Sequence, residues 1–280
     1  MLLIKWLSHV PLSLLYIKSN FLYLLIYYLV DYRKKAVLEN LKLAFPEKRD
    51  AEIKKIRKAF YRHFCDLIFE ILAIRTMSQR ELERRVSVVN PELMKSYFDA
   101  NQSIILVVGH QCNWEWLLQR ACVTYNMPFD AVYKKLQNEK FDEFMIDIRS
   151  RFGGTPIEMQ QTGREIIRRR KEVRGFCMVA DQSPSSTELD YFTDFFGKQT
   201  PFYSGMATIA QMTKYPVIFA DMRKIKRGHY EVEMKVLGEA PYEKGDKTLV
   251  DDFAKTLENQ ISKQPAYWLW SHRRWKHALE

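Results

Sequence analysis

The sequence predicts an α/β fold, with a mostly parallel central sheet flanked by helices and an N-terminal membrane-associated helical segment. Three observations support this prediction. After Pro91, short runs of branched apolar residues such as 103–108 and 175–180 alternate with helix-like stretches. Residues 2–30 are crowded with apolar and aromatic side chains. Basic residues outnumber acidic ones by 44 to 34, which gives a formal net charge of +10.

The N-terminal segment, residues 1–31, is predicted to be a membrane anchor or a pair of interfacial helices. Residues 10–30 are long enough to span a bilayer, which takes about 20 mainly apolar residues, but Lys18 lies among them. A break at that lysine would give two helices lying on the membrane surface. The basic run 33–35 follows directly and favours a cytoplasmic location for the rest of the chain. The remaining alternative is a buried helix of a soluble core.

Residues 32–280 are predicted to form one α/β domain that begins with two helices. Apolar residues at helical spacing indicate these helices at 36–45 and 50–74. On the second, His63 and Asp66 lie one turn apart. We interpret them as an ion pair within the helix, because no second polar cluster is near them in sequence.

The alternating pattern that follows predicts the order of strands and helices. Strands are expected at 103–108, 129–133, 156–159, 175–180, 216–222 and 230–236. Helices are expected at 114–125, 138–151, 162–173, 203–214 and 247–263. Continuous apolar strands are typical of a parallel sheet that helices cover on both faces.

His110 follows strand 103–108, at the edge of the sheet where open α/β folds bind their ligands. Asn113 is suited to cap the next helix, which places Glu115 in its first turn. The loop position of the histidine lets the chain fold back, so that the carboxylate can reach the imidazole and fix its tautomer. The free ring nitrogen can then take a proton from a hydroxyl. From spacing alone, a polar strand end before a capped helix explains these residues equally well.

Other chemistry around His110 is less well supported. Backbone N–H groups at Asn113 and Trp114, or an arginine, are candidates for holding an oxyanion. Zinc is disfavoured, because no second histidine is near in sequence. Cys112 is a weaker candidate for a nucleophile at the helix N-terminus. The other cysteines are expected to be buried apolar residues: Cys65, Cys122 and Cys177.

This His-x4-Glu motif after an apolar strand resembles the lysophospholipid and glycerolipid acyltransferase superfamily. Within it, the chain looks like the lipid A late acyltransferases, the bacterial lauroyl and myristoyl transferases. The resemblance covers nearly all of the chain after the N-terminal segment. Six further blocks similar to those of the family occur in order along the chain, one before this motif and five after it: 40–46, 133–138, 149–153, 181–182, 195–197 and 268–276.

The resemblance implies a glycerolipid acyltransferase-like fold with His110 and Glu115 as the catalytic dyad. It also implies substrate-binding roles for polar residues at matching positions: Tyr133, Lys134, Asn138, Arg149, Arg151 and Asp181. Lys134 replaces the family's usual arginine, which loses the two-pronged contact that a guanidinium makes with phosphate.

The reaction that the resemblance implies takes place at the cytoplasmic face of the bacterial inner membrane. A fatty acyl chain moves from acyl carrier protein, or from acyl-coenzyme A, to a hydroxyl of a lipid A precursor. No cofactor beyond this co-substrate and no metal is expected. A lysophospholipid or aminolipid acceptor, or a non-catalytic lipid-binding protein on the same fold, are the alternatives.

The positive charge suits an anionic partner, such as an anionic membrane surface or acyl carrier protein. The basic run 168–171 is interpreted either as a solvated helix end or as a docking surface for such a partner. The aromatic and basic block 268–275 indicates either a tail lying on the membrane or a part of the core. A nucleic-acid partner is not expected, because no recognised binding module is present.

Overall fold

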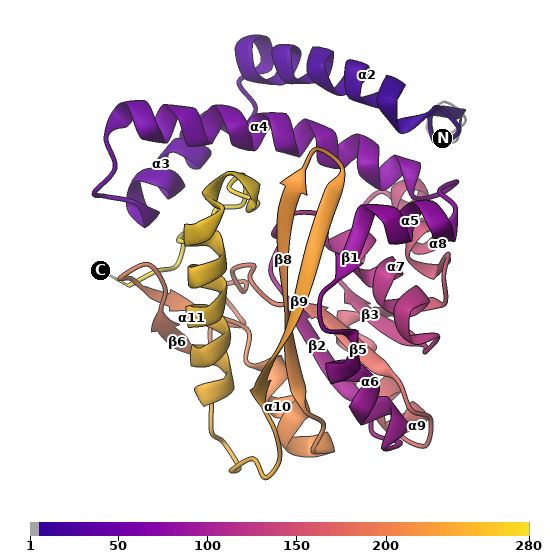
Figure 1. Cartoon of the computed structure of the whole chain (residues 1–280). Helices are drawn as coiled ribbons and strands as arrows, with labels where there is room; N and C mark the ends of the chain where they lie inside the picture. Colours follow the sequence, from indigo (N-terminus) through magenta and orange to yellow (C-terminus); the bar gives the residue numbers. More distant parts are fainter. Residues whose placement is uncertain (1–5, 280) are drawn as a thin grey trace.

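The computed structural model describes residues 6–279 and contains a seven-stranded sheet with helices packed around it (Figure 1). The strand order is β1-β9-β8-β2-β5-β3-β4. Neighbouring strands are parallel except β8 and β9, which form an antiparallel hairpin. The α/β class and the mostly parallel sheet are therefore confirmed. Residues 1–5 of the expected N-terminal segment lie outside the described residues.

The observed elements follow the predicted order. The strands are β1 (Val86–Val88), β2 (Ile104–Val108), β3 (Phe129–Tyr133), β4 (Gly154–Glu158), β5 (Gly175–Val179), β8 (Val217–Lys226) and β9 (His229–Gly238), with a separate ribbon of β6 (Phe192–Asp194) and β7 (Gln199–Pro201). The helices are α2 (Leu12–Leu24), α3 (Lys34–Ala44), α4 (Asp50–Ala73), α5 (Gln79–Arg85), α6 (Pro91–Asp99), α7 (Trp114–Tyr125), α8 (Glu139–Ser150), α9 (Thr162–Arg169), α10 (Gly205–Thr213) and α11 (Thr248–Lys263). The prediction did not include the helices α5 and α6, nor the strands β1, β6 and β7, whose three residues are too few to show an alternating pattern.

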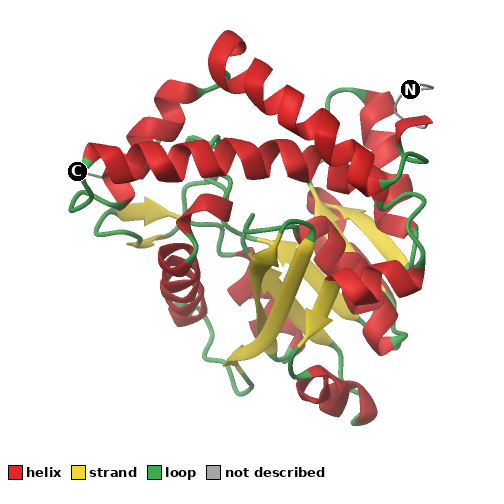
Figure 2. Cartoon of the chain, turned by 45° about the horizontal axis from the view of Figure 1, so that its top comes forward, coloured by secondary structure: helices red, strands yellow, loops and turns green. Residues whose placement is uncertain are grey.

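The core lies on both faces of the sheet, and β2 shows why. All five of its residues are buried. Successive side chains of a strand point to opposite faces. Accordingly Ile105 and Val107 belong to one buried cluster, whereas Leu106 and Val108 belong to the other. The long helix α4 crosses one end of the sheet and contributes to both clusters (Figure 2).

The N-terminal helix lies alongside α4 (Figure 1). It comprises α2 and a following π-helical stretch (Leu25–Val30), and together they are long and apolar enough to cross a membrane. The helix continues through Lys18 without a break. Two side chains fasten it to α4: the hydroxyl of Ser19 donates to Asp66 at 2.6 Å, and that of Tyr16 donates to Glu70 at 2.8 Å.

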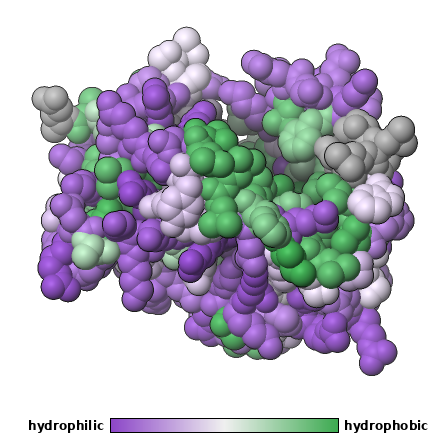
Figure 3. All heavy atoms as spheres, turned by 90° about the horizontal axis from the view of Figure 1, so that it is seen from above, coloured by the Kyte–Doolittle hydropathy of each residue, from purple (hydrophilic) through white to green (hydrophobic). Residues whose placement is uncertain are grey.

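The opposite side of this helix carries apolar side chains that no other element covers. At least 46% of each of these side chains is exposed: Leu14, Ile17, Phe21, Leu24, Leu25, Tyr28, Leu29 and Val30. Seen from above, they contribute to a hydrophobic area on the surface (Figure 3). An apolar row of this size is unusual on a protein surface that faces water alone.

Candidate functional site

The register of two neighbouring strands brings His110 and Asp181 together. β2 and β5 are parallel, and Val108 lies opposite Val179. Two residues beyond these strand ends, Nδ1 of His110 lies 2.5 Å from Oδ1 of Asp181. The backbone N–H of His110 also donates to Oδ2 of Asp181, at 2.8 Å. The pair therefore sits at the carboxyl edge of the sheet, where the sequence places the site.

Asp181 is held as an anion in a buried position. Its side chain is 2% exposed, and Nε1 of Trp268 donates to Oδ2 at 2.6 Å. Burial alone would raise the pKa of Asp181, but the charge of His110 and the hydrogen bonds from His110 and Trp268 outweigh it and lower that pKa to about 2. An ionised carboxylate accepts the Nδ1–H of the imidazole, which leaves Nε2 as the basic nitrogen. The imidazole is 15% exposed, and Nε2 has the exposed side chain of Gln182 at 3.3 Å.

Glu115 contacts Arg149 rather than His110. Its carboxylate accepts two hydrogen bonds, from Nη2 of Arg149 at 2.6 Å and from Nε at 3.0 Å. The expected contact between Glu115 and the imidazole is therefore not formed. Asp181 already occupies Nδ1 of His110, and Glu115, in the first turn of α7, points toward Arg149 at the end of α8. The orienting carboxylate of His110 in this structure is Asp181.

Arg149 stays charged in its partly buried position. Burial would lower the pKa of Arg149, but the carboxylate of Glu115 outweighs this effect and raises it. The guanidinium also lies over the ring of Tyr133, 5.5 Å from its centroid. The structure therefore gathers three of the predicted site residues into a second polar cluster beside the first.

Within residues 6–279, no hydrogen bond or ion pair joins the other predicted substrate-binding residues to these two clusters. Nη2 of Arg151 donates to the backbone oxygen of Met77 at 2.6 Å. The side chain of Asn138 caps α8 by accepting from the N–H of Phe141 at 3.1 Å. Lys134 is exposed at the end of β3 and has no hydrogen-bond or ion-pair partner among residues 6–279. Asn138 and Arg151 thus have structural contacts, whereas the charge of Lys134 is available.

The N-terminus of α7 is formed as the sequence predicts. Oδ1 of Asn113 accepts from the N–H of Trp116 at 3.0 Å, and its Nδ2 donates to the buried carboxylate of Glu70 at 2.9 Å. A single cap leaves the first N–H groups of the helix, those of Trp114 and Glu115, without an intrahelical acceptor. The ring of Trp114 meets the His110 ring edge to face at 4.7 Å. The first turn of α7, with these two N–H groups, thus begins at a residue whose side chain contacts the imidazole.

The block 268–275 packs as part of the core, so its alternative interpretation as a membrane-lying tail is wrong. Trp268, Trp270 and Arg274 are buried. His272, which the sequence left as a possible cation, accepts a hydrogen bond at Nε2 from the N–H of Ser183 at 2.9 Å. Burial, followed by nearby cations, lowers the pKa of His272 to about 4, so the ring is neutral near pH 7. The three tryptophans of this block were the feature of the sequence that pointed to a buried position, and Trp268 contacts Asp181 of the site.

Cys112 does not suit the role of a nucleophile. Its side chain is fully buried, and burial raises the pKa of the thiol far above neutral. All four cysteines are buried free thiols, which confirms the expectation for Cys65, Cys122 and Cys177. Within the described part of the chain, no group of three His, Cys, Asp or Glu side chains is placed to hold a metal ion.

The comparison with known protein families agrees with this geometry. A family model described as bacterial lipid A biosynthesis acyltransferase matches residues 1–277. No curated protein matches the chain. The match extends over the N-terminal helix, the His110 region and the tryptophan-rich block. The chain therefore belongs to the bacterial lipid A biosynthesis acyltransferase family.

Proposed function

We propose that this protein transfers a fatty acyl chain from the thioester of acyl carrier protein to a hydroxyl group of a lipid A precursor. The family supports acyl transfer in lipid A biosynthesis. The observation that carries the mechanism is the His110–Asp181 pair, with Nδ1 of the imidazole held at 2.5 Å by a carboxylate and Nε2 facing the exposed side chain of Gln182. This arrangement suits a general base acting on a hydroxyl.

In the proposed reaction, Nε2 of His110 takes the hydroxyl proton while the acceptor oxygen attacks the thioester carbonyl. Asp181 stabilises the imidazolium that forms. The N–H groups of Trp114 and Glu115 donate to the oxyanion of the tetrahedral intermediate. When the intermediate collapses, the carbon–sulfur bond breaks and the imidazolium returns its proton to the leaving thiolate. An ester and a free thiol are the products.

Glu115 has a different part in this proposal from the one that its spacing suggests. It fixes the guanidinium of Arg149 in a charged and oriented state. A guanidinium matches the geometry of a phosphate group, and a lipid A precursor carries phosphate. Arg149 would bind that phosphate and place the acceptor hydroxyl, with the exposed Lys134 adding positive charge nearby.

The proposal places the protein on the cytoplasmic face of the bacterial inner membrane. The exposed apolar row on the N-terminal helix would enter the interface, while hydrogen bonds to α4 keep the helix flat against the domain. Replacing Phe21 and Leu29 with serine should weaken binding to lipid vesicles at least about tenfold. Ile167→Ser, an exposed site on α9, is the matched control. Unchanged binding of the double variant would contradict the interfacial placement.

The activity itself is tested by incubating the purified protein with acyl carrier protein loaded with a fatty acyl chain and with a lipid A precursor. Mass spectrometry should show a gain of one acyl chain by wild type and none by His110→Ala with its fold intact. Acyl-coenzyme A replaces the donor in a parallel arm, and a lysophospholipid or an aminolipid replaces the acceptor in others. Wild type that transfers to no acceptor would instead be a lipid-binding protein.

A further inference from the structure

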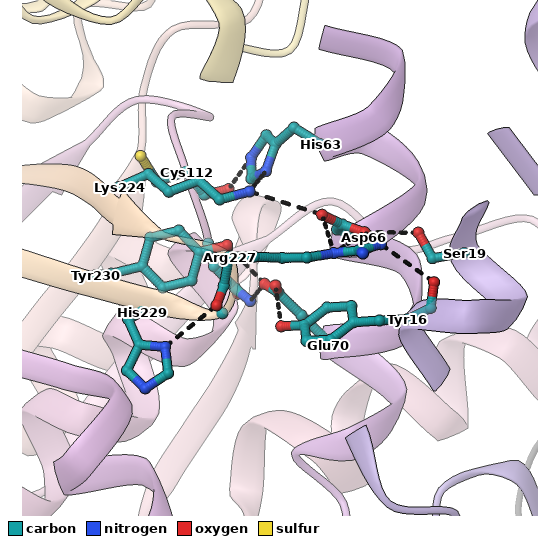
Figure 4. A network of polar contacts seen from close by, with 12 residues as sticks. Tyr16, Ser19, His63, Asp66, Glu70, Cys112, Lys224, Arg227, His229 and Tyr230 are labelled. Carbon is teal, nitrogen blue, oxygen red and sulfur yellow. Dashed lines mark hydrogen bonds and ion pairs between the residues drawn. The ribbon is translucent and has the colours of Figure 1, made fainter. Parts of the chain in front are cut away.

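A second polar region lies behind the His110 loop and belongs to no step proposed above. A cavity of about 620 Å³ opens between α2, α4 and the end of the β8–β9 hairpin. Most of its lining side chains are polar or aromatic, among them Tyr23, Arg62, His63, Asp66, Lys224 and Arg227. Figure 4 shows four of these residues converging from α4 and the hairpin.

The lining of this cavity has an excess of positive charge. Three cations, Arg62, Lys224 and Arg227, line it with one carboxylate, Asp66. Asp66 accepts hydrogen bonds from Nε and Nη2 of Arg227 at 3.0 and 2.5 Å, so these two charges neutralise one another. Three positive charges minus one negative charge leave a surplus of two, on Arg62 and Lys224.

Neither remaining cation has a carboxylate of its own. Nζ of Lys224 lies 3.7 Å from Asp66, which is already engaged, and 5.1 Å from the ring centroid of Tyr267. The guanidinium of Arg62 lies over the ring of Tyr23 and pairs with no carboxylate among the described residues. Two unmatched cations facing one cavity are a binding site for an anion.

His63 adds no charge of either sign. Its Nδ1 accepts from Nζ of Lys224 at 3.2 Å, and its Nε2 donates to the backbone oxygen of Cys112 at 3.2 Å. Burial and the nearby lysine hold the pKa of His63 well below its ordinary value, so the ring is neutral. The ion pair expected between His63 and Asp66 is therefore not formed, and both side chains line the cavity instead.

The mouth of the cavity meets the apolar surface of the N-terminal helix. Leu24 lines the cavity, and half of its side chain is exposed. The same residue belongs to the exposed row that includes Phe21 and Leu25. A ligand with an anionic head and an alkyl tail would thus find cations inside the cavity and apolar side chains beside it. We propose that this cavity binds the phosphate of a membrane lipid head group.

The proposal is tested by calorimetric titration of the full chain with dihexanoyl phosphatidic acid below its micelle concentration. Wild type should bind, and Arg62→Gln or Lys224→Gln should weaken binding at least about tenfold, because each removes a charged hydrogen-bond donor. Lys54→Gln is the matched control, since Lys54 is an exposed, unpaired cation on α4 outside the cavity lining. Equal weakening in all three variants would show attraction to general surface charge and overturn the site.

Inorganic phosphate distinguishes the source of the anion. The lipid should bind at least about tenfold more tightly, because its tail covers apolar side chains at the mouth. Equal affinities would show a site for free phosphate and overturn the lipid assignment. Arg62 is exposed, and within residues 6–279 its side chain has no hydrogen bond or ion pair and lies over the ring of Tyr23, so Arg62→Gln decides the question even if Lys224→Gln does not fold. His110→Ala should bind as wild type does, which separates this test from that of acyl transfer.

Discussion

His110 and His63 each lie near an aspartate, but they differ in exposure and in the partners of their ring nitrogens. His110 is partly exposed and touches a carboxylate 71 positions away. His63 is buried and touches a lysine and a backbone oxygen, although Asp66 stands one turn away on the same helix. The first environment leaves one ring nitrogen basic and accessible. The second keeps the ring neutral and closed to solvent.

The contrast shows that sequence distance is a poor guide to pairing. His63 and Asp66 have the better local spacing, yet each finds a stronger partner on the β8–β9 hairpin. Asp181 reaches His110 because their strands are neighbours in register. The same rule separates Glu115 from His110, since the carboxylate finds Arg149 at the end of α8. Each carboxylate pairs with the nearest cation or donor in space.

Replacing each histidine in turn tests which of the two is the general base. His110→Ala should lower kcat by about 10²–10⁴, the usual contribution of a general base. His63→Gln should retain kcat within about tenfold, because His63 touches no reacting atom in the proposed mechanism. Initial rates of acyl transfer measure both effects, with circular dichroism as the control for folding. A larger loss in His63→Gln than in His110→Ala would reverse the assignment of the two sites.

The roles of the two carboxylates can be separated by the pH dependence of kcat/KM. Asp181→Asn should lower the rate and move the acidic limb of the profile to lower pH, because the anion that favours the imidazolium is lost. Glu115→Gln should lower the rate by misplacing Arg149, but should leave the limb where it is in wild type. Movement of the limb in Glu115→Gln would mean that this carboxylate contacts the imidazole during the reaction.

Breaking the Glu115–Arg149 pair should cost stability. Glu115→Gln leaves the guanidinium of Arg149 without its anion, at a cost of about 3 kcal/mol, the lower end for a buried pair because Arg149 is partly exposed. Urea unfolding at pH 7 measures this difference. Glu115→Gln combined with Arg149→Met should recover part of it. A double variant less stable than the single one would show that the pair does not act as a unit.

The two histidine environments should also differ in how acid affects unfolding. The pKa of His63 lies well below 6.5, so the unfolded chain binds more protons and stability falls as pH drops below about 6.5. Asp181 acts in the same direction but at lower pH: its lowered pKa of about 2 stabilises the fold above pH 3.9 or so, and this is lost as pH falls through about 2. His63→Gln should flatten the first slope and Asp181→Asn the second. Urea unfolding across this pH range measures both, and unchanged slopes would contradict the assignments.

The smallest expected effect concerns Cys112, which joins the two regions. Its backbone oxygen accepts from His63, and it lies two residues after His110. Its buried thiol has a raised pKa, so iodoacetamide should label it no faster than the chain unfolds. Labelling in urea is the positive control. Rapid labelling of the native protein would mean that the loop between the regions opens.

Local features of the site could be predicted from the sequence. The cap at Asn113, the start of α7 and the strand end before His110 all came from residue types and spacing. The strands β1, β6 and β7 could not be predicted in this way, because three residues do not display an alternating pattern. The family resemblance marked Asp181 as a site residue, but without the strand order nothing tied it to His110.

The sequence by itself determined the α/β class, the central strands, the helix cap at Asn113 and the candidate base, because periodicity, turns and capping depend on residues close together in the chain. Only the tertiary structure decided that Asp181 contacts the imidazole of His110 and that Glu115 contacts Arg149. It also decided that His63 and Asp66 line a cavity with an excess of positive charge. The physical reason is that these pairings depend on strand order and on how α4 crosses the sheet. Ionic contacts and hydrogen bonds act over a few ångströms of space, and distance along the chain does not limit them.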